Sequence, residues 1–306
     1  MPAVAAPPVC RMAAACIDQL LAETRSGDKI QVLRTMQRMK TLDVTPDYPI
    51  RSRAGDNGGQ SEHGPGGIGA TIEQLLRDEI ALAPAVPELR QALALSNVQA
   101  GRYAEAERAA RLGLETTPSH APLWSALALA LAGQGKKDGA VAAFVLAHDW
   151  ARDSPAMLNA YRQAAATPPL PTVPTLGDAY REAVEFIVEQ NAKRAALLAT
   201  MTEIKHSDGI VDKAFAMPGL DFNQCAMPVW PKTSLRREES GKTTLLFALD
   251  VDGTLLLAGI AVSSGHAELD NAALLGALSC QGIAAKKDGK PIRAVGRIQY
   301  VWELEP

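Results

Sequence analysis

The sequence predicts an α+β protein of several domains, in which all-α helical hairpins are followed by a small β-β-α-β domain. Three observations lead to this fold class. A helical pattern recurs with a period of 34 residues before residue 166, apolar residues alternate strictly after about residue 220, and glycine or proline clusters interrupt the chain at 51–70 and 167–177. The length of 306 residues suits about two domains of roughly 150 residues each.

The composition is that of a soluble globular protein and narrows the classes of function. Hydrophobic residues make up 47% and charged residues 21%, so most of the chain can bury a core. The 31 basic and 34 acidic side chains give a net charge of -3, which supplies no field to gather phosphates, so nucleic acid is not expected as a partner. The best candidate for a membrane span, residues 123–132, has about half of the roughly 20 residues required, so no transmembrane segment is expected.

Residues 1–50 are interpreted as two short amphipathic helices, at 10–24 and 28–42, because apolar residues recur on one face of each. The apolar run before Asp18 is too short for a signal peptide. Residues 51–70 are rich in glycine and almost free of large apolar side chains, which predicts a flexible linker. Cys10 and Cys16 are six positions apart in a predicted helix and point to different faces, so no disulfide is expected between them.

Residues 71–166 form the predicted helical domain, and its most informative feature is the repeat. Leu93, Gly101, Ala106, Ala110 and Gly113 recur 34 positions later as Leu127, Gly135, Ala140, Phe144 and Ala147. Over residues 86–166 this spacing resembles the tetratricopeptide repeat, a pair of antiparallel helices in which small residues permit close contact. The helix 71–82 and the segment 155–166 are expected to cap the array. A generic pair of helical hairpins is the alternative.

The proline cluster at 167–177 predicts a semi-rigid linker, because proline favours an extended conformation. Residues 178–221 are interpreted as a connecting helix and loop. Apolar residues near a 3.6-residue period place that helix over 176–204.

The C-terminal domain, residues 222–306, is predicted from alternating apolar residues. Strands at 243–251 and 254–262 flank Asp252-Gly253, which predicts a hairpin with a two-residue type I′ turn. A helix follows, with Asp270 as a candidate cap, and a last alternating strand covers about 295–304. The predicted order is therefore β-β-α-β.

The motifs of this segment resemble the C-terminal domain of TonB-type energy transducers. Residues 225–231, CAMPVWP, match the Cys-x-x-Pro and Tyr-Pro opening of that family, with tryptophan in place of tyrosine. The family's Val-x-x-Asp-Gly, Val-x-x-Ser-Ser-Gly and Leu-Asp motifs follow in order as 249–253, 260–265 and 269–270, and Cys280 and Asp288-Gly289 also match. The resemblance covers about residues 222–306.

The resemblance implies a periplasmic domain that binds the TonB box of an outer-membrane transporter, or a related extended peptide, as an added strand. In the family the last strand receives the peptide, and the residues expected to bind the partner here are Trp230, Pro231, Arg297, Ile298, Gln299, Tyr300, Val301 and Trp302. For Trp230, Tyr300 and Trp302, packing in the core is an equal alternative. The resemblance also implies a disulfide between Cys225 and Cys280.

Two alternatives stay open at this point. The chain is either periplasmic, as the resemblance implies, or cytoplasmic, since it has no recognisable signal peptide. The C-terminal domain either captures a peptide or is a structural or dimerising part of a tetratricopeptide-like scaffold that transduces no energy. The oligomeric state is not predicted, although dimers through edge strands would fit.

No catalytic, cofactor or metal site is predicted, so a protein or peptide partner is expected rather than a substrate. The five histidines, His63, His120, His148, His206 and His266, show no metal-ligand spacing. Ser264, His266 and Asp270 are close in sequence, but no nucleophile-elbow motif surrounds them, and turn chemistry explains them better. No phosphate-binding loop occurs.

Overall fold

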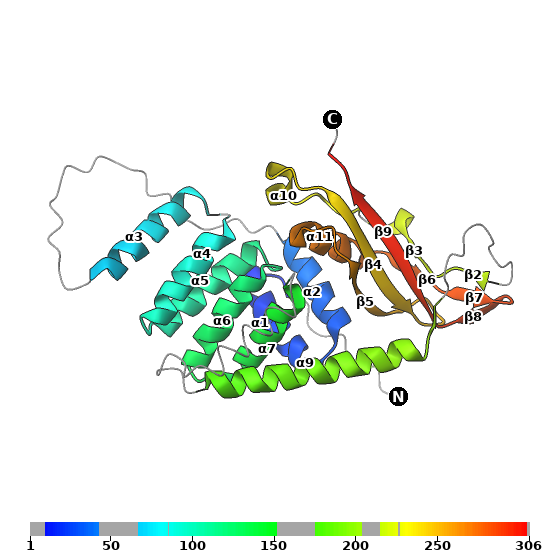
Figure 1. Cartoon of the computed structure of the whole chain (residues 1–306), viewed down its shortest axis with the longest axis horizontal. Coiled ribbons are helices and arrows are strands. Elements are labelled where there is room, and N and C mark those ends of the chain that lie inside the picture. Colours follow the sequence, from blue (N-terminus) through cyan, green and yellow to red (C-terminus); the bar gives the residue numbers. More distant parts are fainter. Residues whose placement is uncertain are drawn as a thin grey trace. The chain divides into compact units, whose positions relative to one another are not determined.

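The structure, a computed structural model, describes residues 10–42, 67–84, 86–151, 175–203, 215–225 and 227–304. Helices make up the N-terminal part, and a small β-rich domain with helices follows, which confirms the predicted α+β fold class (Figure 1). The chain divides into two compact units, one of Met1–Ala22 with Met39–Ala183 and one of Glu23–Arg38 with Val184–Pro306. Among the described helices, none is long and apolar enough to cross a membrane.

The first unit is built around two helical hairpins related by the predicted period. α4 (Pro87–Gln99) and α5 (Tyr103–Thr116) form one hairpin, and α6 (Ala121–Gly133) and α7 (Lys137–Trp150) form the next. Every helix bound of the second hairpin lies 34 residues after its counterpart in the first. The 34-residue period is therefore confirmed, and assignment to the tetratricopeptide family stays a prediction.

Small residues and backbone geometry explain why these helices pair. Gly101 and Gly135 follow the first helix of each hairpin with the same positive φ of +73°, which glycine adopts without strain. An ideal Cβ on Gly133 would lie 2.2 Å from the Tyr103 ring, so only glycine permits that approach. Trp124 is fully buried and donates from Nε1 to the Pro118 carbonyl at 2.8 Å.

The start of α9 (Leu176–Ala199) covers the end of this array. The rings of Tyr180 and Phe144 meet edge to face with centroids 5.8 Å apart, and Lys137 pairs with Glu182 at 2.9 Å. The Thr175 hydroxyl donates to the Ala132 carbonyl. The segment 155–166, predicted as a cap, lies outside the described residues. The linker predicted at 167–177 is also outside them up to residue 174, and its end belongs to α9, which begins at Leu176.

The N-terminal helices are present, but the prediction about their cysteines is wrong. α1 spans Ala13–Ser26 and α2 spans Lys29–Thr41. Cys10 and Cys16 form a disulfide with Cα atoms 5.2 Å apart. The prediction failed because Cys10 precedes α1 instead of lying within it, so the chain turns back and the Cys10 N–H donates to Gln19 Oε1.

The end of the predicted glycine-rich linker is also helical, because α3 spans Gly67–Leu82. Residues 51–66 of that linker lie outside the described residues.

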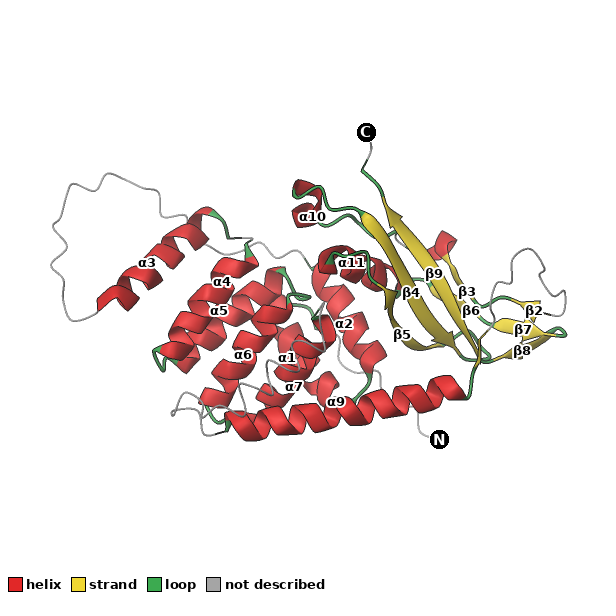
Figure 2. Ribbon diagram, viewed as in Figure 1, coloured by secondary structure: helices red, strands yellow, loops and turns green. Residues whose placement is uncertain are grey.

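The second unit holds three small sheets (Figure 2). The main sheet has the order β1-β9-β4-β5, with β1 (Thr202–Glu203), β9 (Ala294–Trp302), β4 (Gly241–Leu249) and β5 (Leu255–Val262). β2 (Phe215–Ala216), β7 (Ala285–Lys287) and β8 (Lys290–Ile292) form the second sheet, and β3 (Gly219–Asp221) pairs with β6 (Gln281–Ile283) in the third. The unit also contains the 3-10 helix η1 (Phe222–Gln224), α10 (Lys232–Arg236) and α11 (Ala267–Ala277).

The predicted order β-β-α-β is found as β4, β5, α11 and β9, with three short strands inserted before β9. α11 packs on β4 and β5, and its Leu274 and the C-cap residue Leu278 line a small hydrophobic cavity together with Phe247. Gly296 in β9 leaves room for the Phe247 ring, since a Cβ there would lie 2.4 Å from Cζ. The helix therefore covers one face of the sheet.

The turn predicted at Asp252-Gly253 has a different form. The connection runs from Asp250 to Thr254, and within it only Gly253 has a positive φ, whereas a type I′ turn requires two. Asp250 and Asp252 each accept a backbone N–H through Oδ1, from Val251 at 2.7 Å and Thr254 at 2.8 Å, which supports the wider loop. A two-residue turn with two positive φ angles joins β7 and β8 at Asp288-Gly289 instead.

Candidate functional site

The last strand, β9, has one edge that is largely open. Its inner edge pairs with β4 along the whole strand, from Ala294 opposite Leu249 to Trp302 opposite Gly241. Its outer edge pairs in parallel with β1 only at Ala294 and Val295. No other described strand pairs with the outer edge, so the stretch from residue 296 to 302 is available for backbone pairing.

Alternate side chains give the two faces of β9 different characters. Arg297, Gln299 and Val301 are exposed on one face. Ile298 and Tyr300 are half-buried on the other, where Trp302 is only 5% exposed. This alternation agrees with the predicted strand, although β9 ends at Trp302 and leaves Glu303 and Leu304 beyond it.

An aromatic cluster anchors the C-terminal half of β9. The Trp230 and Trp302 rings meet at 5.4 Å, those of Tyr300 and Trp302 at 6.1 Å, and those of Phe222 and Tyr300 at 6.4 Å. The Tyr300 hydroxyl donates to Met227 Sδ at 3.7 Å, and burial raises the pKa of Tyr300 above its ordinary value. The tyrosine is therefore neutral around pH 7 and keeps its proton for this contact.

This cluster makes Trp302 a core residue, while part of the cluster stays exposed. The Nε1 of Trp230 is buried without a hydrogen-bond partner among the described residues, so contact with Trp302 holds the ring. Phe222 is 39% and Met227 63% exposed. The packing alternative is therefore found for these aromatics, and a part in binding stays a prediction, supported by the apolar surface that the same group presents beside the open edge.

The opening segment of the domain is tied to the end of α11. Cys225 and Cys280 form the implied disulfide, with Cα atoms 4.6 Å apart, inside the range that disulfides allow. Next to it, β3 pairs with β6, with Asp221 opposite Gln281. A Cβ on Gly276 would lie 2.6 Å from Pro228 Cγ, so this glycine lets the segment lie directly on α11. Pro231 then leads into α10 as its N-cap residue.

A series of buried side-chain hydrogen bonds holds the end of β9 to β4 and α11. Trp302 Nε1 donates to Thr243 Oγ1 at 3.3 Å, and that hydroxyl donates to Asp270 Oδ1 at 2.8 Å. Asp270 also accepts from the Ser264 N–H at 2.8 Å and from the Ser263 hydroxyl. The N-cap of α11 is His266, so Asp270 does not cap the helix as predicted and instead joins its first turn to the end of β5.

At the opposite end of β9, an ion pair joins the β4–β5 turn to the chain just before the strand. Arg293 donates from Nε and Nη2 to the two oxygens of Asp250, at 2.9 and 3.1 Å. These hydrogen bonds, with that from the Val251 N–H, lower the pKa of the Asp250 carboxyl, which therefore stays ionised at neutral pH. The pair is exposed and serves to orient the turn rather than to stabilise the fold strongly.

The eight residues expected at the partner site lie on β9 and in the opening segment, whose Trp230 contacts Trp302. Six of them, residues 297–302, belong to the strand, and Trp230 and Pro231 lie in the opening segment. Sequence reasoning missed Phe222, Met227 and the Thr243–Asp270 link, because no periodicity relates residues so far apart in the chain. Among the described residues, no group of His, Cys, Asp and Glu side chains is suited to a metal ion.

Comparison with known families identifies this segment. Residues 226–304 match the family described as the Gram-negative bacterial TonB protein C-terminal, which confirms the resemblance for this part of the chain. Domains of this family act in the periplasm in protein interactions, and the match therefore indicates an envelope-associated interaction role. No curated protein and no solved structure matches the chain.

Proposed function

We propose that the C-terminal domain binds an extended peptide by β-strand addition to the outer edge of β9. The observation that carries this proposal is the edge itself, which lacks a described partner from residue 296 to 302 in a segment that matches the TonB C-terminal family. An incoming strand gains backbone hydrogen bonds there at little cost, because β9 is already held extended by β4.

The affinity of this edge comes mainly from the backbone, and its selectivity comes from side chains. In an antiparallel pair, alternate residues direct both N–H and C=O to one side, so about half of residues 296–302 face outward. An added strand would place its own side chains beside Gln299 and Val301 on one face and beside Tyr300 on the other. This arrangement suits a peptide with apolar residues at alternate positions.

The partner that fits best is a TonB-box-like segment of an outer-membrane transporter, with the helical repeats as a second protein-binding scaffold. The two disulfides support a periplasmic location, since such bonds persist in oxidising compartments. The proposal does not require energy transduction by this chain.

The experiment uses the full-length protein and a labelled TonB-box peptide in a fluorescence anisotropy titration. Two further peptides carry N-methyl groups on the backbone at alternate positions, in opposite phases. Strand addition predicts that one phase abolishes binding and the other leaves it almost unchanged, because only one set of N–H groups points to β9. Equal loss in both phases, or no binding of the unmodified peptide, would overturn the proposal.

A second candidate is dimerisation through β5, which is the other edge of the main sheet. Residues 255–262 carry no charge and no proline, and Ile260 and Val262 are 40% and 57% exposed, so two of the usual edge protections are missing, although the register with β4 is irregular at two points. Sedimentation of Ile260→Lys against the wild type tests this. A dimer that the lysine dissociates, together with peptides that do not bind, would favour the structural role.

A further inference from the structure

The first unit contains the same cluster of ionic contacts twice, one repeat apart. Glu107 of α5 accepts from Arg111 through Oε1 and from Lys136 through Oε2, each at 2.8 Å. Burial alone would raise the pKa of Glu107, but hydrogen bonds from Lys136, Gln134 and Arg111 outweigh it and lower the pKa. Glu107 is thus an ionised anchor between α5 and the turn after α6.

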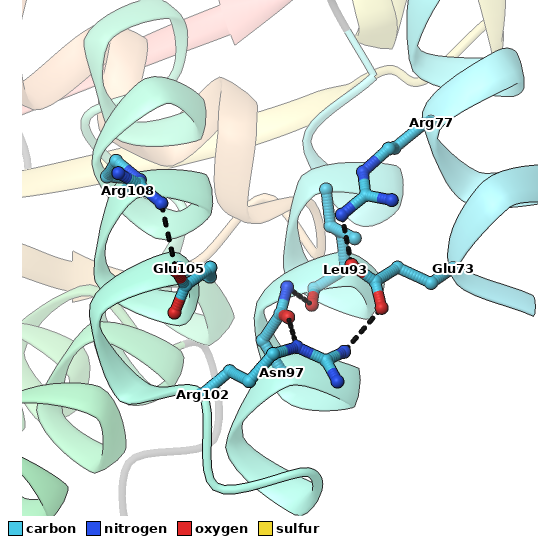
Figure 3. Close-up of polar contacts among 7 residues, drawn as sticks. All are labelled: Glu73, Arg77, Leu93, Asn97, Arg102, Glu105 and Arg108. Atoms are coloured by element: carbon cyan, nitrogen blue, oxygen red, sulfur yellow. Dashed lines mark hydrogen bonds and ion pairs between the residues drawn. The ribbon is translucent and has the colours of Figure 1, made fainter. Parts of the chain in front are cut away.

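Glu73 of α3 makes the equivalent contacts 34 positions earlier. Its Oε1 accepts from Arg77 and its Oε2 from Arg102, the counterparts of Arg111 and Lys136 (Figure 3). Arg102 also donates from Nε to Asn97 Oδ1 at 2.8 Å, and Asn97 Nδ2 donates to the Leu93 carbonyl. The buried Glu73 carboxylate therefore ties α3 to the first hairpin as Glu107 ties α5 to the second.

The position of α3 agrees with this correspondence. α3 ends at Leu82, which is 34 residues before Thr116 at the end of α5. α3 packs against α4 as α5 packs against α6. Ile80 is buried like its counterpart Leu114. α3 therefore corresponds in position and contacts to the second helix of a further repeat.

The first helix of that repeat would fall at residues 53–65, whose sequence does not favour a helix. This stretch carries Gly55, Gly58, Gly59, Gly64 and Pro65, and no large apolar side chain. It lies outside the described residues. The sequence thus supplies the second helix of a pair without a suitable first one.

Four residues share one side of α3, and we call this side the open face of α3; they are Leu75, Leu76, Glu79 and Leu82. Leu75 is 58% and Leu82 77% exposed, Leu76 is half-buried and Glu79 is exposed. In α5 the counterparts are Ala109, Ala110, Gly113 and Thr116, of which the first three are buried. The positions that are buried on α5 are therefore accessible on α3, and three of the four carry leucine there.

We propose that the open face of α3 binds an amphipathic helix of a partner protein, with apolar residues against the leucines and an arginine or lysine beside Glu79. The expectation of a basic residue on the partner helix comes from comparison with the complete hairpins. A Cβ on Gly113 would lie 2.7 Å from Leu123 Cδ1 in α6 and 3.1 Å from Cβ of Arg90 in α4, and Glu79 occupies the position of Gly113. A basic residue at the Arg90 position of a docked helix would therefore meet a carboxylate.

Pairing of α3 with α3 of a second copy fits less well. A twofold axis through the middle of the open face would bring Asp78 and Glu79 of one copy against the same residues of the other. Like charges opposed in this way repel, whereas a basic helix is attracted to them.

The test uses the full-length protein and a labelled peptide of residues 86–99, which has the native sequence of α4 and carries Arg90. Saturable binding is expected, and Leu75→Gln should weaken it about tenfold, because an apolar anchor at the centre of a small contact contributes most of its affinity. The matched control is Leu112→Gln, since Leu112 is also an exposed helical leucine, 41% exposed, but lies on α5. This control should bind like the wild type.

A charge exchange tests the predicted pairing directly. Glu79→Arg should weaken the native peptide several-fold, and the peptide with Arg90→Glu should recover binding to Glu79→Arg but not to the wild type. Equal binding of the peptide to the wild type and to Leu75→Gln would overturn the proposal. No binding of the peptide at concentrations up to about 1 mM would overturn it as well. Self-association that Leu75→Gln abolishes, without peptide binding, would also overturn it and assign the face to a second copy.

Discussion

Replacing both Cys225 and Cys280 by serine is expected to lower the free energy of unfolding of the second unit by about 4 kcal/mol. The disulfide closes a loop of 55 residues, and the entropy that such a loop removes from the unfolded chain grows with the logarithm of its length. The same relation gives about 2 kcal/mol for Cys10–Cys16, which are separated by only 6 residues. The two bonds should therefore differ by roughly a factor of two in their effect.

Urea unfolding under oxidising conditions, followed by far-ultraviolet circular dichroism, gives both free energies, and the Cys10→Ser/Cys16→Ser protein is the matched comparison. A parallel thiol titration of the unfolded wild type should find no free thiol before reduction. Two reactive thiols at 225 and 280, or a loss below about 1 kcal/mol in the larger loop, would refute the loop-entropy reasoning. A larger effect from the short loop would refute it as well.

Two further predictions concern the helical repeats. Gly133→Ala should destabilise the first unit by about 1–3 kcal/mol, because the added methyl meets the Tyr103 ring, and thermal unfolding measures this; an unchanged midpoint would show that the ring moves freely. Burial lowers the pKa of His120, although Glu88 opposes this, and neutral Nδ1 accepts the Leu123 N–H at the start of α6. Since the unfolded chain takes up the proton first, stability should be full above about pH 6.5 and fall as the pH drops through the lowered pKa. His120→Asn keeps an acceptor without titrating and should flatten this part of the pH profile, whereas an unchanged profile would assign the effect to another group.

Much of the fold follows from local patterns that the sequence displays directly. The 34-residue period predicted both hairpins, because each helix must present a similar small-residue face to its neighbour. Alternating apolar residues predicted β4, β5 and β9, since side chains of a strand point to opposite faces in turn. The cysteine pair of the C-terminal domain came from the family resemblance and not from spacing.

The failures have a common physical origin in contacts that hydrophobic periodicity does not reveal. Cys10 pairs with Cys16 because α1 starts later than its pattern suggested, which lets the chain turn back. The turn at Gly253 is wide, and a Cβ there would lie 2.3 Å from the Gly282 carbonyl oxygen, a neighbour that no local pattern reveals.

The sequence by itself determined the order of the main helices and of β4, β5, α11 and β9, the alternation of β9 and the repeat, because these depend on residues within a few turns or one strand of each other. Only the tertiary structure decided which edge of β9 is open, since that depends on where β1 and β4 pair. It also decided that Glu73 repeats the contacts of Glu107 and that α3 exposes Leu75 and Leu82. Pairing and burial are properties of neighbours in space, and a chain can bring the same local pattern to a covered or an uncovered position.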